Sequence, residues 1–214
     1  MLRCKSEDLA ILFDLGKVLL DFDFETGVQA LHKACSISRD RLEEVLWDEN
    51  WIRRYERGEI STGEFHAYLR ETADLSMDLE GFCRTWSSVF LPELLVSEDL
   101  LRALRKRYPL ILVSNTNEAH IEFVRANYRV LDYFDYHVLS YEIGSLKPDR
   151  KVFEHAIAAA GHPPQALFYT DDREENIQAA RQLGMRVHQF STASALVDAL
   201  QDAGVDIGDV IADH

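Results

Sequence analysis

Acidic side chains stand directly at the ends of two short apolar runs of the sequence. Asp14 ends the run 10–14 and is soon followed by Gly16, and the pair Asp171 and Asp172 closes the run that begins at Leu167. A carboxylate at the tip of a buried strand, beside a glycine that allows a sharp turn, is a candidate nucleophile. Adjacent carboxylates repel each other unless a cation or hydrogen bonds compensate, which favours a hard metal ion such as Mg²⁺. A structural turn residue at Asp14 and a helix N-cap at Asp172 are the alternatives that remain open.

Candidate anion ligands stand at two other places in the chain. Ser114 and Asn115 follow an apolar run and precede a helix pattern, so a hydroxyl and backbone amides there could cradle an anion. Ser and Asn are equally ordinary as helix N-caps. Lys147 lies directly before Pro148, which opens a helix and thereby fixes the position of the lysine. A solvated loop lysine is the alternative at that position.

Short apolar runs must position these side chains, and they cover residues 10–14, 110–114, 136–140 and 167–171, with a weaker run at 186–190. In the C-terminal half they alternate with helix patterns at 117–127, 149–160, 173–183 and 193–203. Continuous apolar runs separated by helices are typical of strands that are buried on both faces of a parallel sheet. The predicted fold class is α/β.

The interval between residues 14 and 110 has helix patterns at 25–34, 39–47, 62–71 and 77–89, and no convincing strand. It is too long for a loop. We therefore expect a helical insert at residues 22–92 over the carboxyl end of the first strand, where open α/β sheets bind ligands. The core domain is expected to comprise residues 1–21 and 93–214.

Aromatic residues at helical spacings are expected to pack inside the insert, with one or two lining a substrate pocket; they are Trp47, Trp51, Tyr55 and Phe65. Arg53 and Arg54 are expected on a solvated face of the insert. His66, His120 and His155 are expected on helix surfaces.

The composition narrows the classes of partner and compartment. The 214 residues include 23 Lys and Arg against 37 Asp and Glu, and the net charge of −14 repels nucleic acid and anionic membranes. The widely spaced Cys4, Cys35 and Cys83 indicate neither a disulfide framework nor a zinc site. Because no apolar stretch approaches about 18 residues and the first residues are unlike a signal peptide, we expect a cytoplasmic protein.

Taken together, four segments resemble the motifs of the haloacid dehalogenase-like (HAD) superfamily in sequence, order and spacing: residues 11–19, 113–116, 144–149 and 171–185. The resemblance implies a Rossmann-like parallel sheet with a helical cap, which would be the insert. Residues 55–61 look like a cap segment of that superfamily's sugar-phosphate phosphatases. The implied activity is hydrolysis of a phosphoric monoester, and the implied partner is a small phosphorylated metabolite.

The resemblance also implies a role for each matched residue. Asp14 would attack phosphorus and form an aspartyl phosphate, while Ser114, Asn115 and Lys147 would hold the phosphoryl oxygens. The implied Mg²⁺ site comprises Asp14, the carbonyl oxygen of Gly16 and Asp171, with Asp172 and Asn176 orienting the water shell of the metal. Such a cation and a lysine are needed because the attacking carboxylate and the phosphate are both anions.

One position departs from the family pattern. Most phosphatases of the superfamily carry a second Asp two residues after the nucleophile, as the general acid, and this chain has Gly16 there. A general acid contributes about 10² to 10⁴ in rate. We favour a phosphatase restricted to good leaving groups, such as anomeric or acyl phosphates. An acid borrowed from Asp21, Asp23 or the cap is a second interpretation.

Two further hypotheses come from other classes of protein. A 2-haloacid dehalogenase needs neither a proton on its leaving halide nor a metal. Dehalogenase relatives, however, lack the pair of carboxylates that this chain carries at 171–172. A catalytically silent binding or regulatory protein with the same fold is disfavoured by the intact set Asp14, Ser114, Lys147 and Asp171.

Overall fold

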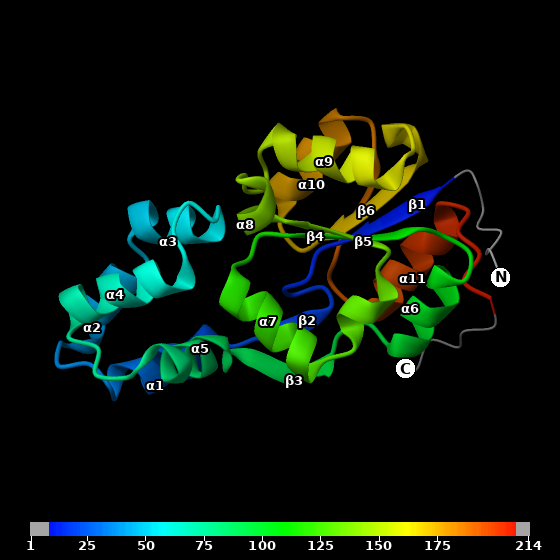
Figure 1. Ribbon diagram of the computed structural model, residues 1–214. Helices are drawn as coiled ribbons and strands as arrows, with labels where there is room; N and C mark the ends of the chain where they lie inside the picture. The colour runs from blue at the N-terminus through cyan, green and yellow to red at the C-terminus, as the bar shows by residue number, and fades with distance from the viewer. Residues whose placement is uncertain (1–8, 209–214) are drawn as a thin grey trace.

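A computed structural model describes residues 9–208 of the chain (Figure 1). Residues 1–8 and 209–214, which include Cys4 and both ends of the expected core domain, lie outside the described residues. Within residues 9–208 a five-stranded sheet has the order β5-β4-β1-β6-β7, and all of its pairings are parallel. Its strands are β1 (Ala10–Phe13), β4 (Leu110–Ser114), β5 (Tyr136–Leu139), β6 (Leu167–Asp171) and β7 (Arg186–Gln189). The predicted α/β class with a Rossmann-like parallel sheet is confirmed.

The continuous apolar runs arise because helices cover both faces of the sheet (Figure 1). Successive side chains of a strand point to opposite faces, and in β1 Ile11 and Phe13 join one hydrophobic cluster while Ala10 and Leu12 join another. The first cluster includes side chains from α6 (Glu98–Arg105), α7 (Glu118–Asn127) and α11 (Ala193–Asp202). The second includes side chains from α9 (Arg150–Ala160) and α10 (Glu174–Gln182).

The interval between β1 and β4 forms a helical layer that lies to one side of the sheet (Figure 1). Its helices are α1 (Phe24–His32), α2 (Arg39–Leu46), α3 (Glu49–Glu56), α4 (Thr62–Ala73) and α5 (Leu79–Ser87). They share a hydrophobic cluster with side chains such as Phe65 and Phe82, which Ala119 of α7 also joins. We call these helices the cap. Helix α3 was absent from the expected helix patterns although Trp51 and Tyr55 stand at helical spacing; the helix is short and rich in charge, and Tyr55 is its one buried side chain.

The chain leaves and re-enters the core through a short antiparallel pair, β2 (Leu20–Phe22) and β3 (Phe90–Leu94). The expectation that no strand lies between residues 14 and 110 was therefore wrong. The three residues of β2 are too few for a periodic signal, and β3 contains Pro92 in an exposed stretch, which weakens any strand pattern. This pair sets where the cap stands relative to the end of β1.

Shorter elements connect the rest: the helix α8 (Ser140–Ile143) and the 3-10 turns η1 (Val130–Tyr133) and η2 (Pro164–Ala166). Among residues 9–208, no helix combines the length and the apolar character that crossing a membrane would require.

Candidate active site

The candidate residues of the core meet at the carboxyl ends of three neighbouring strands. Strand β1 pairs with β4 on one side and with β6 on the other, so Asp14, Ser114 and Asp171 reach the same edge of the sheet. A cavity of about 600 Å³ lies between this edge and the cap. Asp14, Ser114 and Lys147 line its floor. The sequence-predicted strand ends are thus brought together at one site.

Lys147 links the carboxylates of the floor. Its Nζ lies 2.8 Å from Asp14 Oδ1 and 2.7 Å from Asp171 Oδ2, and it donates a third hydrogen bond of 2.9 Å to the carbonyl oxygen of Val113. The side chain is 1% exposed, so these partners replace water almost completely. A backbone hydrogen bond of 2.7 Å from Leu15 N–H also orients Asp14 Oδ1.

Asn115 holds the loop that carries the lysine. The backbone N–H of Lys147 donates to Asn115 Oδ1 at 2.7 Å, and Asn115 Nδ2 donates to the carbonyl oxygen of Lys147 at 3.0 Å. Asn115 was expected to bind phosphate, but its side-chain amide is engaged with the backbone of Lys147. Ser114 is buried at the end of β4 and faces the same cavity, with only a long hydrogen bond of 3.4 Å to a backbone carbonyl.

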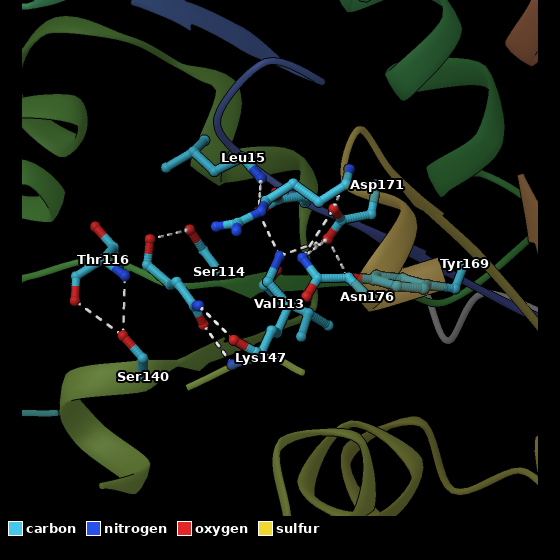
Figure 2. Close-up of polar contacts among 12 residues, drawn as sticks. Leu15, Val113, Ser114, Thr116, Ser140, Lys147, Tyr169, Asp171 and Asn176 are labelled. Atoms are coloured by element: carbon cyan, nitrogen blue, oxygen red, sulfur yellow. Dashed lines mark hydrogen bonds and ion pairs between the residues drawn. The ribbon is translucent and has the colours of Figure 1, made fainter. Parts of the chain in front are cut away.

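Asp171 is completely buried, and donors from several elements hold its carboxylate (Figure 2). Asn176 Nδ2 lies 2.9 and 3.0 Å from its two oxygens, and the backbone N–H of Arg173 donates to Oδ1 at 2.9 Å. The hydroxyl of Tyr169 donates to Oδ2. Asp172, in contrast, is partly exposed and lines the cavity. The two adjacent carboxylates therefore have different environments.

The buried charges of the floor do not balance. Burial, and then the nearby Asp171 carboxylate, raise the pKa of Asp14 to about 7, against the lowering effect of Lys147. Burial alone would raise the pKa of Asp171, but Lys147, Tyr169 and the backbone of Arg173 hold it below its usual value. Burial would lower the pKa of Lys147, yet the two carboxylates hold it above its usual value. One ammonium thus faces two buried carboxylates, and a further cation would relieve the excess negative charge.

The floor also offers the ligands that such a cation needs. Asp14, Asp171 and Asp172 each present one carboxylate oxygen, and these atoms lie within 4.8 Å of one another. A cluster of carboxylate oxygens suits a hard divalent ion such as Mg²⁺, which retains several waters and takes few protein ligands. Gly16 lines the same cavity, as the expected carbonyl ligand requires. The residues present therefore fit Mg²⁺.

The position of the missing general acid is closed by an aromatic ring. A Cβ atom at Gly16 would lie 2.7 Å from Phe22 Cε1, so any side chain there requires the ring to move. Asp21 forms an ion pair with Lys17, and the hydrogen bond from that lysine lowers the pKa of Asp21. Asp23 caps α1 by accepting from Glu25 N–H at 2.9 Å. Neither aspartate is among the residues that line the cavity.

The cap supplies the roof of the cavity with aromatic and charged side chains. The aromatic residues are Phe24, Trp47, Trp86 and, from β3, Phe90; the charged ones are Glu49, Arg53 and Glu56. Trp51, Tyr55 and Phe65 pack within the cap, as expected, whereas Trp47 is 39% exposed. Glu56 was not singled out as a site residue, because it lies outside the four motifs and the contact that brings it to the cavity comes from Ser140, far along the chain.

Two of the histidines lie elsewhere than expected. His120 and His66 are buried, because cap helix α5 covers the face of α7 that bears His120 and packs beside His66. His120 Nε2 lies 3.2 Å from the carbonyl oxygen of Trp86, and burial lowers the pKa of its ring to about 4. The ring is therefore neutral at the cavity wall. His155 is exposed, as expected.

The end of α3 is fastened to the core beside the phosphate-binding candidates. Ser140 Oγ lies 2.7 Å from the carbonyl oxygen of Glu56 and 2.9 Å from both the N–H and the carbonyl oxygen of Thr116. Gly58 has φ of +67°, and a Cβ atom there would lie 2.1 Å from the carbonyl oxygen of Tyr141. Only glycine allows the cap backbone to approach α8 this closely.

Comparison with known proteins agrees with this geometry. A family model described as haloacid dehalogenase-like hydrolase matches residues 9–184. D-ribitol-5-phosphate phosphatase of Bacteroides thetaiotaomicron is 29% identical over 185 residues, covering 84% of this chain and 90% of that protein. Pyrimidine 5'-nucleotidase YjjG of Escherichia coli is 26% identical over 193 residues, covering 82% of each.

A similar solved structure is that of a HAD family enzyme from Bacteroides thetaiotaomicron in complex with magnesium and inorganic phosphate. It has 29% sequence identity and a TM-score of 0.76, and the match covers 86% of this chain and 94% of that one. The family match begins at residue 9, the first described residue, and ends at residue 184, one residue before the end of the fourth motif. The chain belongs to the haloacid dehalogenase-like hydrolase family, as its four motifs indicated.

Proposed function

We propose that this chain is a Mg²⁺-dependent phosphatase that hydrolyses a small phosphorylated metabolite through an aspartyl phosphate on Asp14. The observation that carries the proposal is the arrangement of Asp14 at the cavity floor, 2.8 Å from Lys147 Nζ and beside two further carboxylates. A carboxylate held in this way is a positioned nucleophile with a cation to offset its charge.

The proposed roles follow from which groups reach the cavity. Asp14 attacks phosphorus, while the hydroxyl of Ser114 donates to a phosphoryl oxygen. Lys147 favours the ionised form of Asp14 against the effect of burial and attracts the phosphate, and Asn115 fixes the loop that carries this lysine. The proposed contact of Asn115 with the phosphate is through its backbone N–H, because its side-chain amide holds the backbone of Lys147.

The proposed metal ligands are Asp14, the carbonyl oxygen of Gly16, Asp171 and Asp172. Of the adjacent pair, Asp172 lines the cavity, whereas Asp171 is surrounded by Lys147, Tyr169 and Asn176. We therefore assign Asp172 the more direct contact. Mg²⁺, when bound there, would neutralise the phosphate and the attacking carboxylate.

The proposed substrate is a sugar phosphate or a molecule of similar size. The organic part would lie under the cap, between the aromatic side chains of the roof and the guanidinium of Arg53. The similarity to a D-ribitol-5-phosphate phosphatase supports this choice. In the proposed division of the chain, residues 22–92 form the cap domain that selects the substrate, and residues 1–21 and 93–214 form the core domain that carries out the chemistry.

Two other functions of the same site would differ from a phosphatase in the product that is released. A 2-haloacid dehalogenase would release halide without metal, and the cluster of carboxylates beside Asp14 stands against it because an acid substrate would be repelled. A silent binding protein would release neither product, and the intact pairing of Asp14 with Lys147 stands against that role.

The test is a panel of sugar phosphates, nucleotides, acetyl phosphate and 2-haloacids, assayed for phosphate and halide with Mg²⁺ and with a chelator. The proposal predicts phosphate release that requires both Mg²⁺ and Asp14, with Asp14→Asn as the matched inactive variant. Halide release in the presence of chelator would instead establish the dehalogenase. Binding of phosphate esters without any release would support the silent protein.

A further inference from the structure

We propose that Glu56 of the cap is the general acid and base of this enzyme, in place of the carboxylate that the first motif lacks. It would protonate the leaving oxygen and later take a proton from water. This inference rests on the proposed phosphatase function, and it assigns a catalytic role to a residue outside the four motifs.

The usual position of the general acid, two residues after Asp14, cannot serve. At Gly16 the ring of Phe22 occupies the space that a side chain would need, at 2.7 Å from a Cβ atom. Asp21 and Asp23 are engaged with Lys17 and with the start of α1. An acid for the leaving group must therefore come from another part of the cavity wall.

Besides Asp14, four acidic side chains among the described residues line the cavity: Glu49, Glu56, Asp172 and Glu175. Glu49 is 80% exposed and pairs with Arg53, and Glu175 pairs with Arg173 near the surface. Asp172 belongs to the metal candidates. Of the other three, Glu56 is the one that is neither strongly exposed nor in an ion pair, and no hydrogen bond to its carboxylate is formed within residues 9–208.

The backbone of Glu56 is held in place by the core. Ser140 Oγ binds the carbonyl oxygen of Glu56 at 2.7 Å and the backbone of Thr116 at 2.9 Å. Thr116 follows the phosphate candidates Ser114 and Asn115, so one hydroxyl ties the backbone of Glu56 to the loop that would hold the phosphate. A proton donor fixed to that loop keeps its position relative to the reacting phosphorus.

The chemical state of the carboxyl fits the role. Burial raises the pKa of Glu56 to about 7, although Arg53, Arg173 and Arg57 each oppose the rise. Arg53 and Arg57 belong to the same helical segment, Arg173 precedes α10, and the acidic Glu49 and Glu175 line the same cavity. A group that titrates near neutral pH can act first as acid and then as base.

The proposed reaction balances in two displacements. In the first, an Asp14 oxygen bonds to phosphorus, the bond from phosphorus to the ester oxygen breaks, and the Glu56 proton moves to that oxygen to release an alcohol. In the second, water bonds to phosphorus while Glu56 takes its proton, and the bond from phosphorus to Asp14 breaks. Inorganic phosphate leaves, and Asp14 and Glu56 return to their starting forms.

The experiment compares phenyl phosphate with 4-nitrophenyl phosphate, which have similar shapes but a poor and a good leaving group. For Glu56→Gln we expect kcat/KM on phenyl phosphate to fall about 100-fold or more, with a much smaller loss on 4-nitrophenyl phosphate. Glu59→Gln, an exposed change just beyond the same helix, is the matched control and should leave both rates unchanged. Asp14→Asn should abolish both.

Two further readouts separate a catalytic role from a structural one. On phenyl phosphate the wild-type kcat/KM should fall as pH rises above about 7, because Glu56 loses its proton, and this alkaline limb should vanish in Glu56→Gln. Added formate should partly restore the Glu56→Ala variant but not Asp14→Asn. Equal losses on the two esters, or an unchanged alkaline limb, would overturn the role of Glu56. Turnover that survives Asp14→Asn would instead overturn the proposed function.

Discussion

The floor and the roof of the cavity are built from different kinds of interaction. On the floor, a lysine that is 1% exposed binds two buried carboxylates, and the backbone N–H groups of Leu15 and Arg173 donate to them. In the roof, aromatic side chains and partly exposed charges stand on the cap helices and on β3, and these contact the core at a few places such as the stacking of Trp86 on His120. The floor can therefore fix one reaction, while substitutions in the roof can change the substrate at little structural cost.

The largest expected difference between the two regions is in activity. Asp14→Asn should lower kcat by roughly 10⁴ or more, because it removes the nucleophile. Trp47→Ala, in the exposed part of the roof, should act mainly on KM, by roughly 10-fold or less. Steady-state kinetics on the best substrate of the panel would measure both. A loss of kcat in Trp47→Ala as large as that in Asp14→Asn would break the distinction between floor and roof.

The second expected difference is in stability. Lys147→Met leaves two buried carboxylates without their cation, which should lower the free energy of unfolding by about 3 to 5 kcal/mol. The matched change in the cap is Arg41→Gln, which removes an ion pair whose side chains are 60% and 65% exposed. It should cost less than about 1 kcal/mol. Urea unfolding of both variants would measure these losses. Similar losses in free energy of unfolding for Lys147→Met and Arg41→Gln would contradict the stronger coupling of the floor.

A third prediction concerns Gly16, where floor and roof meet. Gly16→Ala should destabilise the protein by about 1 to 3 kcal/mol, because the new methyl group would collide with the ring of Phe22. The cost should be smaller in a Phe22→Leu background, so a double-mutant cycle isolates the collision. Additive effects of the two changes would mean that the ring does not exclude a side chain at this position.

The smallest expected effect is the pH dependence of stability at Glu56. Because burial raises its pKa in the folded state to about 7, its protonated form favours folding, and this stabilisation is lost as pH rises from the unfolded value through about 7. Glu56→Gln keeps an uncharged side chain at every pH. The Tm of Glu56→Gln minus the Tm of the wild type should therefore increase as the pH rises from 5 to 8. A difference in Tm that stays constant over this range would contradict the raised pKa.

The same contrast explains what could be predicted from the sequence. The strand ends at Asp14, Ser114 and Asp171 were predictable because a buried parallel strand leaves an uninterrupted apolar run, and its polar terminus then stands out. Because the strands pair in parallel, their carboxyl ends lie at the same edge of the sheet, so the proximity of these residues was predictable as well. The role of Lys147 was predictable only from the resemblance to the family, because Pro148 and Asp149, which stand just before α9, are equally compatible with a solvated loop lysine.

The roof lacked such signals. The role of Phe22 depends on the turn that brings β2 back beside Gly16, and a three-residue strand has no periodicity to indicate it. Glu56 reaches the cavity because Ser140, which lies 84 residues further along the chain, binds its backbone. His120 is buried by a cap helix rather than by its own neighbours in sequence. Contacts between distant segments set all of these positions.

The measurement that tests the central claim most directly is detection of the phosphoryl group on Asp14. The enzyme would be mixed with Mg²⁺ and 4-nitrophenyl phosphate, quenched in acid within the first turnovers, digested and examined by peptide mass spectrometry. We predict a phosphorylated peptide that contains Asp14 in the wild type and its absence in Asp14→Asn. Steady turnover in which no phosphoryl group is ever carried by that peptide, or is carried by another residue, would contradict the account.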